Sequence, residues 1–234
     1  EDAFLLKLDA NGNFIWARKI GGALADRATA IAVDAVGMLY LGGVFAGRVD
    51  MDPGPAQQFL TSVGNSADIF WTALTPEGIW SASRQFGGPG AEQLNALKPS
   101  GAFVYLAGSF SDSLDLDPGP GVAQILSKGQ MDGFIARYSI AGTFDWARQI
   151  GGAGDDFVSD VAVGSSTGIA VTGSFTGEVT LDSAAPGGGL SGRGGTDLFI
   201  ALYNDQGAFL RSATLGGEGE DKGLGITGDP ATGG

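Results

Sequence analysis

The hydrophobic and polar positions of this chain repeat with one long period. Short apolar stretches alternate with turns rich in Gly and Asp. A stretch of the form Asp-x-Phe, turn, apolar strand, Gly-Gly occurs four times, beginning at Asp2, Asp68, Asp132 and Asp197. The four Gly-Gly pairs begin at residues 21, 87, 151 and 216, which are 64 to 66 residues apart. A fixed period predicts a repeat architecture in which each unit is one supersecondary motif.

Each full period predicts four short strands, A to D in chain order. Strand A is expected at 29–33, 94–98 and 159–163, with a weaker copy at 224–227. Strand B is expected at 38–45, 103–110 and 169–175. A long connection follows strand B, then strand C begins at Asp-x-Phe and strand D ends at Gly-Gly. The A–B and C–D turns contain Gly, which reaches the positive φ that tight hairpins need.

Strand B is apolar at successive positions, whereas a strand with one face in water alternates. Both of its faces are therefore expected to be covered. Gly43, Gly108 and Gly173 recur in the middle of this strand. Glycine inside a strand indicates the close approach of another backbone.

Four antiparallel strands buried on both faces are typical of a β-propeller blade. We therefore predict an all-β fold of about four blades, either closed or part of a larger ring, with 1–234 as one domain or a fragment of one. The expected pieces are strands C and D at 2–22, full blades at 23–88, 89–152 and 153–217, and the start of another blade at 218–234. The leading C–D pair and the trailing strand A could share one blade.

The amino-acid composition disfavours several classes of partner and of catalytic chemistry. Gly accounts for 42 of 234 residues, and no long stretch has a helical period. The net charge of −13 disfavours nucleic acid and anionic membrane surfaces as partners, and no apolar run is long enough to span a bilayer. The chain has neither Cys nor His. This excludes disulfides, thiolate metal sites and the commonest general base.

The stretches GNFIWARKIGG, LYLGGVF and VDMDPG carry a resemblance that covers essentially the whole chain. They resemble the bacterial seven-bladed beta-propeller repeat family. The resemblance implies a propeller in a secreted or cell-surface bacterial protein, and it implies no catalytic residues. Two copies of strand D depart from the pattern, at 80–84 and 209–213.

Acidic residues recur in the long B–C connection, and we treat them as Ca²⁺ candidates: Asp50, Asp52, Asp115, Asp117 and Asp182. Carboxylate and loop carbonyl oxygens are the ligands that Ca²⁺ prefers. The alternative is turn chemistry, because Asp caps its own backbone and Pro-Gly bends the chain. Repetition in each unit favours the turn.

Two further acidic rows recur. One opens strand C, and the other lies five residues after each first Gly of the pair, at Asp26, Glu92, Asp156 and Asp221. The stretch 151–159 also matches a Ca²⁺-binding nonapeptide, which works only when copies follow one another directly. With copies about one period apart, we interpret the match as a turn between blades.

Arg18, Arg84 and Arg148 recur on strand D and are expected to pair with a repeated Asp rather than to anchor a ligand. Trp16 and Trp146 share one repeat position and are expected to pack rather than to stack on sugars.

The sequence thus predicts an extracellular, non-enzymatic propeller scaffold that binds protein or glycan through its loops. One alternative is a carbohydrate-binding propeller with a shallow pocket in each blade. Another is a structural subunit that self-associates through open blade edges, because an unpaired edge recruits strands. Glycoside hydrolysis by paired carboxylates is disfavoured, because no acid departs from the repeat pattern.

Overall fold

The computed structural model describes residues 1–64, 66–164, 168–182 and 185–228 of the 234-residue chain. The prediction of an all-β fold is confirmed, since eighteen strands and no helix occur in this part. It accordingly contains no helix of the length and apolarity that crossing a bilayer requires.

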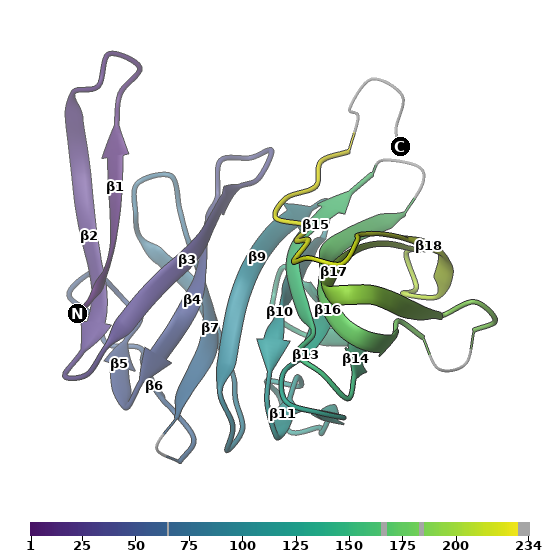
Figure 1. Cartoon of the computed structure of the whole chain (residues 1–234). Helices are drawn as coiled ribbons and strands as arrows, with labels where there is room; N and C mark the ends of the chain where they lie inside the picture. The colour runs from purple at the N-terminus through teal and green to yellow at the C-terminus, as the bar shows by residue number, and fades with distance from the viewer. Residues whose placement is uncertain (65, 165–167, 183–184, 229–234) are drawn as a thin grey trace.

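The strands group into four units in chain order (Figure 1). Unit 1 is the hairpin of β1 (Ala3–Leu8) and β2 (Phe14–Gly22). Units 2 to 4 are antiparallel meanders of four strands each. Unit 2 contains β3 (Asp26–Val33), β4 (Leu39–Ala46), β7 (Ala67–Leu74) and β8 (Trp80–Phe86). Unit 3 contains β9 (Glu92–Ser100), β10 (Phe103–Phe110), β13 (Asp132–Ser139) and β14 (Phe144–Gly152). Unit 4 contains β15 (Phe157–Val163), β16 (Ile169–Thr180), β17 (Gly189–Tyr203) and β18 (Phe209–Leu215).

The expected strands A and B appear as β3, β9 and β15 and as β4, β10 and β16. The second strand of each unit is mostly buried at successive positions, as its unbroken apolar pattern predicts. The glycines of this strand do mark a close backbone approach. At Gly173 a Cβ atom would overlap the carbonyl oxygen of Phe157 in β15, and Gly43 and Gly108 repeat the contact.

The long B–C connection has strand structure that the sequence did not reveal. In units 2 and 3 it forms the hairpins β5 (Arg48–Asp50)–β6 (Phe59–Thr61) and β11 (Ser113–Asp115)–β12 (Gln124–Leu126). In unit 4 the ends of β16 and β17 extend in its place. Each of these segments pairs with the end of the preceding unit's last strand, through Gly21↔Asp50, Gly87↔Asp115 and Gly151↔Thr180. The Gly-Gly pair is therefore where one unit joins the next.

Both glycines of the pair are required by packing. A Cβ atom at Gly151 would overlap the carboxylate of Asp132, and one at Gly152 would overlap the carbonyl oxygen of Glu178 in the next unit. The same two contacts recur at the pairs beginning at Gly21 and Gly87. The repeated Asp and the repeated Gly-Gly thus form one steric unit.

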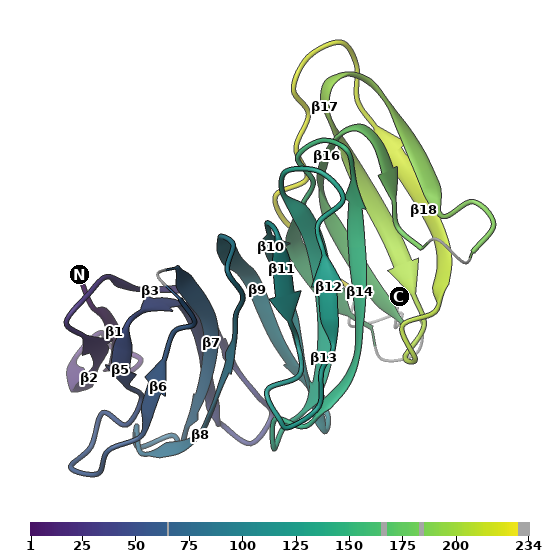
Figure 2. The ribbon, with the colours of Figure 1, turned by 90° about the horizontal axis from the view of Figure 1, so that it is seen from below.

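The units follow one another along an open arc, and apolar clusters fill the space between neighbours (Figure 2). The β1–β2 hairpin and the β17–β18 strands lie at opposite ends of this arc. The sheet curls, but the units do not close into a ring.

The described residues do not show the two ends sharing one blade. β1 pairs with β2 and with no other strand of the described chain. The trailing segment 218–228 runs along unit 4 instead, where Glu220 forms a β-bridge with Thr196 and Ile226 donates its amide to Asp160 Oδ2 (3.0 Å). It does not form the strand expected at 224–227, and residues 229–234 lie outside the described part.

Candidate functional site

The first strand of units 2, 3 and 4 carries a β-bulge at the same repeat position. Pairing of β3 with β4 skips Thr29, between Ala28↔Gly43 and Ala30↔Gly42. Pairing skips Asn95 in β9 and Ser159 in β15 in the same way. A bulge takes a residue out of the regular in-and-out alternation and re-aims its side chain.

These three bulge residues line one hollow of about 590 Å³, which we call the inner hollow. Its other lining residues come from β9, from unit 4 and from the trailing segment. They are Leu94, Asp155, Phe157, Ser174, Thr176, Thr196, Lys222 and Leu224. The inner hollow therefore belongs to three units together and not to one of them.

The lining of the inner hollow is mainly hydroxyl and amide groups, which both donate and accept hydrogen bonds. Asp155 and Lys222 are its two charged residues. Asp155 Oδ1 accepts the amide of Met131 (3.2 Å), and Lys222 forms an ion pair with Glu220 (3.2 Å). Such a surface suits a neutral, hydroxyl- or amide-rich ligand.

The bulge row also connects neighbouring units. Thr29 Oγ1 donates to the carbonyl of Leu94 (2.6 Å), and Asn95 Nδ2 donates to the carbonyl of Val158 (2.7 Å). At the next step along the arc, Asp160 accepts the amide of Ile226. The floor of the inner hollow is thus held by bonds between units, which fixes the spacing of its polar groups.

The acidic row after each Gly-Gly pair closes a turn. Asp26, Asp156 and Asp221 accept the amide of the second Gly of their pair at 2.7, 2.6 and 2.9 Å. Asp156 is fully buried, and burial raises its pKa to about 6. Its neighbour Asp155 faces the inner hollow. The nonapeptide-like stretch is therefore a turn between units, as interpreted.

Glu92 occupies the same place between units 2 and 3, but its environment differs. The side chain is 5% exposed, and neither carboxylate oxygen makes a hydrogen bond of regular geometry among the described residues, although the nearby Gly88 amide partly offsets the rise in its pKa. Burial, and secondly the charge of Asp68, raise its pKa to about 8. Glu92 is therefore protonated in the folded chain at neutral pH. Together with Asp26 it borders a second cavity of about 410 Å³.

The Ca²⁺ candidates lie in the B–C connections and do not line the inner hollow. Asp50 Oδ1 accepts the amides of Asp52 (3.1 Å) and Gln58 (2.9 Å), and Asp52 Oδ1 accepts that of Gly54 (2.7 Å). Asp115 and Asp117 repeat these bonds in the next unit. These contacts favour the turn alternative.

Asp182 is half-buried, in the corresponding connection of unit 4. Among the described residues, no three His, Cys, Asp or Glu side chains group as metal ligands would. Asp115 and Asp117 do border an outer cavity of about 780 Å³ between units 2 and 3, next to Arg84 and Phe144. Ca²⁺ binding at these loops stays a prediction, and melting with and without EGTA would test it.

The Asp that opens the third strand of each unit is buried and bonded within its own unit. Asp68 accepts the Val63 amide (3.0 Å) and Gln85 Nε2 (2.6 Å), and Asp132 makes the equivalent bonds with Lys128 and Gln149. Burial raises the pKa of both carboxyls. This row is structural, as the repeat pattern indicates.

The repeated Arg and Trp bind the turn of the next unit, and the predicted Arg–Asp ion pair is wrong. Arg18, Arg84 and Arg148 donate from Nε to the carbonyls of Gly78 (3.2 Å), Gly142 (3.2 Å) and Gly207 (2.7 Å). No ion pair of these three residues occurs in the described chain. Each guanidinium binds backbone carbonyl groups of a turn. Because every residue has such a carbonyl, these partners could not be recognised from the positions of acidic residues in the sequence.

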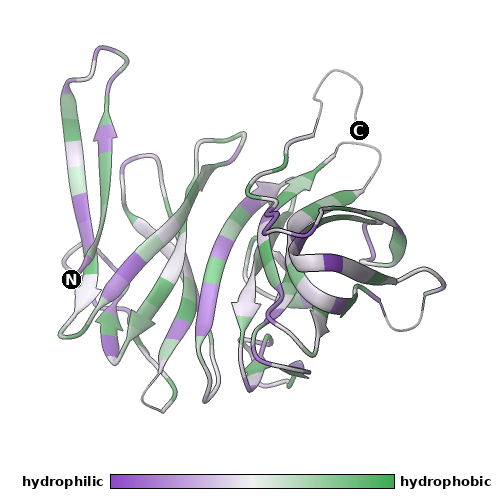
Figure 3. Cartoon of the chain, in the orientation of Figure 1, coloured by the Kyte–Doolittle hydropathy of each residue, from purple (hydrophilic) through white to green (hydrophobic). Residues whose placement is uncertain are grey.

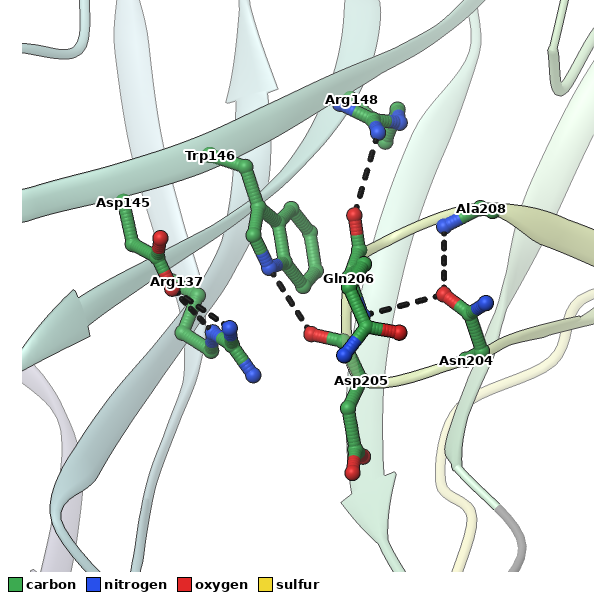
Figure 4. Close-up of polar contacts among 8 residues, drawn as sticks. All are labelled: Arg137, Asp145, Trp146, Arg148, Asn204, Asp205, Gln206 and Ala208. Carbon is green, nitrogen blue, oxygen red and sulfur yellow. Dashed lines mark hydrogen bonds and ion pairs between the residues drawn. The ribbon is translucent and has the colours of Figure 1, made fainter.

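Figure 4 shows Trp146 and Arg148 of β14 pointing toward the turn at 204–208. Trp146 is 8% exposed, and its Nε1 donates to the carbonyl of Asp205 (3.0 Å). Beside it, Arg137 forms an ion pair with Asp145 (2.5 Å) and lies over the ring of Phe103. The prediction that this Trp position packs is confirmed.

The bulge residues were missed as site residues, although a signal for them exists. Glycine inside a strand also marks bulges. Gly43, Gly108 and Gly173 are the partners that stand opposite each bulge. The repeated glycine indicates where each bulge lies along the strand. It does not indicate the inner hollow, which forms only when three units pack side by side along the arc.

Comparison with known proteins adds no family. No model of a known protein family matches the chain, and no curated protein matches it. The function therefore rests on the site itself.

Proposed function

We propose that this chain is a non-enzymatic binding module of the β-propeller type, secreted or held at a bacterial cell surface. Each four-stranded unit would be one blade, of a closed propeller or of a larger ring. Support comes from three antiparallel meanders that pack face to face through apolar clusters, and from the resemblance of the repeat sequence. A fold by itself does not determine a function, so the proposed binding activity depends on the residues of a specific site.

The observation that carries the proposal is the inner hollow, whose lining is mainly neutral hydroxyl and amide groups. Binding sites combine a concave shape with a small number of fixed polar groups. Thr29 and Asn95 are fixed by their bonds to the next unit, and Ser159 occupies the same bulge position. We infer that a glycan or a peptide segment of a partner protein binds here through hydroxyl and amide contacts.

The carbohydrate-binding alternative with a pocket in each unit has less support. The inner hollow is shared by three units. Trp71 and Trp146, which could have stacked on sugar rings, are buried between units. A glycan would therefore be held mainly by hydrogen bonds rather than by stacking.

A pocket-filling variant tests the proposed site. Ser159→Trp places an indole in the inner hollow, and Ser81→Trp, at an exposed position of β8, is the matched control. Both variants and the native chain would be applied to a glycan array and to a peptide array. We expect a native signal that Ser159→Trp loses and Ser81→Trp keeps. A signal that survives Ser159→Trp would move the site elsewhere.

Enzymatic activity would contradict the proposal. Asp155 is the acidic residue of the inner hollow, so Asp155→Ala is the variant of choice. Turnover of a small hydrolase substrate by the native chain, abolished by this change, would show that the hollow is an active site.

A further inference from the structure

One end of the arc exposes an apolar surface on the β1–β2 hairpin, which we call the N face. It consists of Phe4, Leu6, Leu8 and Phe14, of which Phe4 is 71% exposed. Figure 3 shows hydrophobic positions along both strands of this hairpin. Leu5, which points the other way, is buried against unit 2.

The residues equivalent to the N face are covered in the other units. Phe134, Ala136 and Tyr138 of β13 are fully buried in the cluster that joins unit 3 to unit 2. Phe199, Ala201 and Tyr203 of β17 are fully buried in the cluster that joins unit 4 to unit 3. This repeat position is thus the one that packs on a preceding unit.

The opposite end of the arc exposes the complementary surface, which we call the C face. It consists of Ile200 and Leu202 on β17, which are half-buried, and of Leu215 on β18. Ile200 and Leu202 line a hollow of about 370 Å³ together with Arg211, Ser212 and Ala213. Leu215 is 57% exposed, whereas its equivalents Ile20, Phe86 and Ile150 are buried. This repeat position is the one that packs on a following unit.

The polar contacts between units are open at the same two ends. Each internal turn glycine would carry its Cβ against an Arg or Trp side chain of the preceding unit, whereas Gly12 in the turn of unit 1 has nothing nearby. Gly217, the second Gly of the last pair, likewise has no atom of the described residues within 4 Å of its Cβ position. Ala213 stands where the other units carry the turn-binding Arg.

The trailing segment 218–228 lies along unit 4. Ile226 lies ten residues after Gly216, as Ile31, Leu97 and Val161 lie after their own first glycines. The segment runs along β15 and β16, where Ile226 bonds to Asp160 and Gly223 donates to the Gly173 carbonyl. Ile226 therefore occupies the repeat position of a first strand, although the described segment forms no strand.

We propose that the N face of one copy of this chain docks on the C face of a second copy, head to tail. The two faces of one molecule lie at opposite ends of the open arc and do not meet (Figure 2). Inside the chain, surfaces of these two kinds meet at each junction between units. The intermolecular contact continues the apolar part of that series, without the arginine contact that Ala213 removes. Because the surfaces differ, the interface is heterologous and gives a ring or a filament.

Two variants with a charge control test this contact, which does not depend on the proposed ligand site. The double change Phe4→Glu with Leu6→Glu blocks the N face, and Leu215→Glu blocks the C face. Val122→Glu, at a position 77% exposed on the B–C connection, adds the same charge elsewhere. All altered side chains are already exposed, and circular dichroism would confirm that each variant folds.

Light scattering after size exclusion gives the readout. We expect the native chain and Val122→Glu to exceed the chain mass of 23.6 kDa, with a mass that rises with concentration. Each blocked variant should run at the chain mass. An equal mixture of the two blocked variants should give a dimer of twice that mass and nothing larger, because one intact N face and one intact C face remain.

Three outcomes would overturn the proposal. One is a native chain that stays monomeric at every concentration, as it would if a different partner covered these faces. Another is an N-face variant that still self-associates. The third is a mixture of blocked variants in which no dimer forms.

Discussion

The junction between units 2 and 3 and the junction between units 3 and 4 share one design but differ in one acidic residue. Asp156 accepts the amide of Gly152 and so completes its turn. Glu92 is longer by one methylene, and its buried oxygens make no regular hydrogen bond, only a weaker contact with the Gly88 amide. The pKa values of about 6 and about 8 reflect this difference. A repeat position therefore defines a role only when the side-chain length also fits.

The largest expected effect on stability comes from replacing the second glycine of the Gly-Gly pair, which both junctions share. Gly152→Ala should lower the free energy of unfolding by about 3 kcal/mol, because its Cβ would overlap the carbonyl of Glu178. Gly88→Ala should do the same against Ser113. Gly217→Ala is the matched control with open space around it, and it should cost less than about 1 kcal/mol. Urea unfolding measures all three, and equal losses would contradict the junction model.

Glu92→Gln tests whether ionisation of Glu92 makes the stability of the chain depend on pH. The folded chain holds a proton on Glu92 that the unfolded chain releases above pH 4.5, so native stability falls as pH rises from 4.5 to about 8. Gln removes this loss. We expect a gain of roughly 3 kcal/mol at pH 8 and none at pH 4. A gain of equal size at both pH values would show that ionisation is not its cause.

Exchanging the acidic residues at positions 92 and 156 should change stability in opposite directions. Asp156→Glu loses the turn bond and adds a methylene to a buried site, so we expect a loss of about 1–2 kcal/mol at neutral pH. Glu92→Asp should bring a carboxylate to the Gly88 amide and stabilise the chain by about 1 kcal/mol. Calorimetric melting of both variants would show opposite shifts in Tm. Shifts of the same sign would mean that the surrounding packing, and not the acid, sets the difference.

The smallest effect concerns the arginine row. Arg148→Lys keeps the charge but loses the fork that reaches two turn carbonyls, so we expect about 1 kcal/mol of destabilisation. Arg193→Ala, at an exposed position of β17, should change stability by less than about 0.5 kcal/mol. Arg84→Lys should match Arg148→Lys, since its guanidinium donates to the carbonyls of Gly142 and Ala141 in the turn of unit 3. Denaturant midpoints would resolve these differences.

The strands were predictable because their signals are local. Strand B shows its double burial in an unbroken apolar run, and the C–D turns show their Gly at positive φ, as at Gly142. The Gly-Gly pair gave the position of the joint between units, but not the pairing with Asp50 or Asp115. That pairing connects residues about 30 apart, and nothing in either segment alone encodes it.

The inner hollow could not be predicted for the same reason. Thr29, Asn95 and Ser159 look like ordinary polar residues of a half-exposed strand, and only the bulges and the curvature of three units bring them together. The acidic loops were conspicuous in the sequence because Asp-x-Asp-Pro-Gly repeats. Their carboxylates nevertheless close turns, as Asp50 and Asp115 show.

In units 2 to 4, the segment between the second and third strands pairs with the end of the preceding unit. We expect these contacts to determine at which end the chain begins to unfold. Backbone bonds from β5 and β16 hold the ends of β2 and β14, and the isolated bridge at Asp115 holds the end of β8. Among the described residues, no such segment pairs with the end of β18, and nothing lies within 4 Å of the Cβ position of Gly217. Fraying should therefore start at β18, and amide exchange there should run ahead of that in β14. Any contact that packs against β18 would stabilise the last unit and so make the whole array melt more cooperatively.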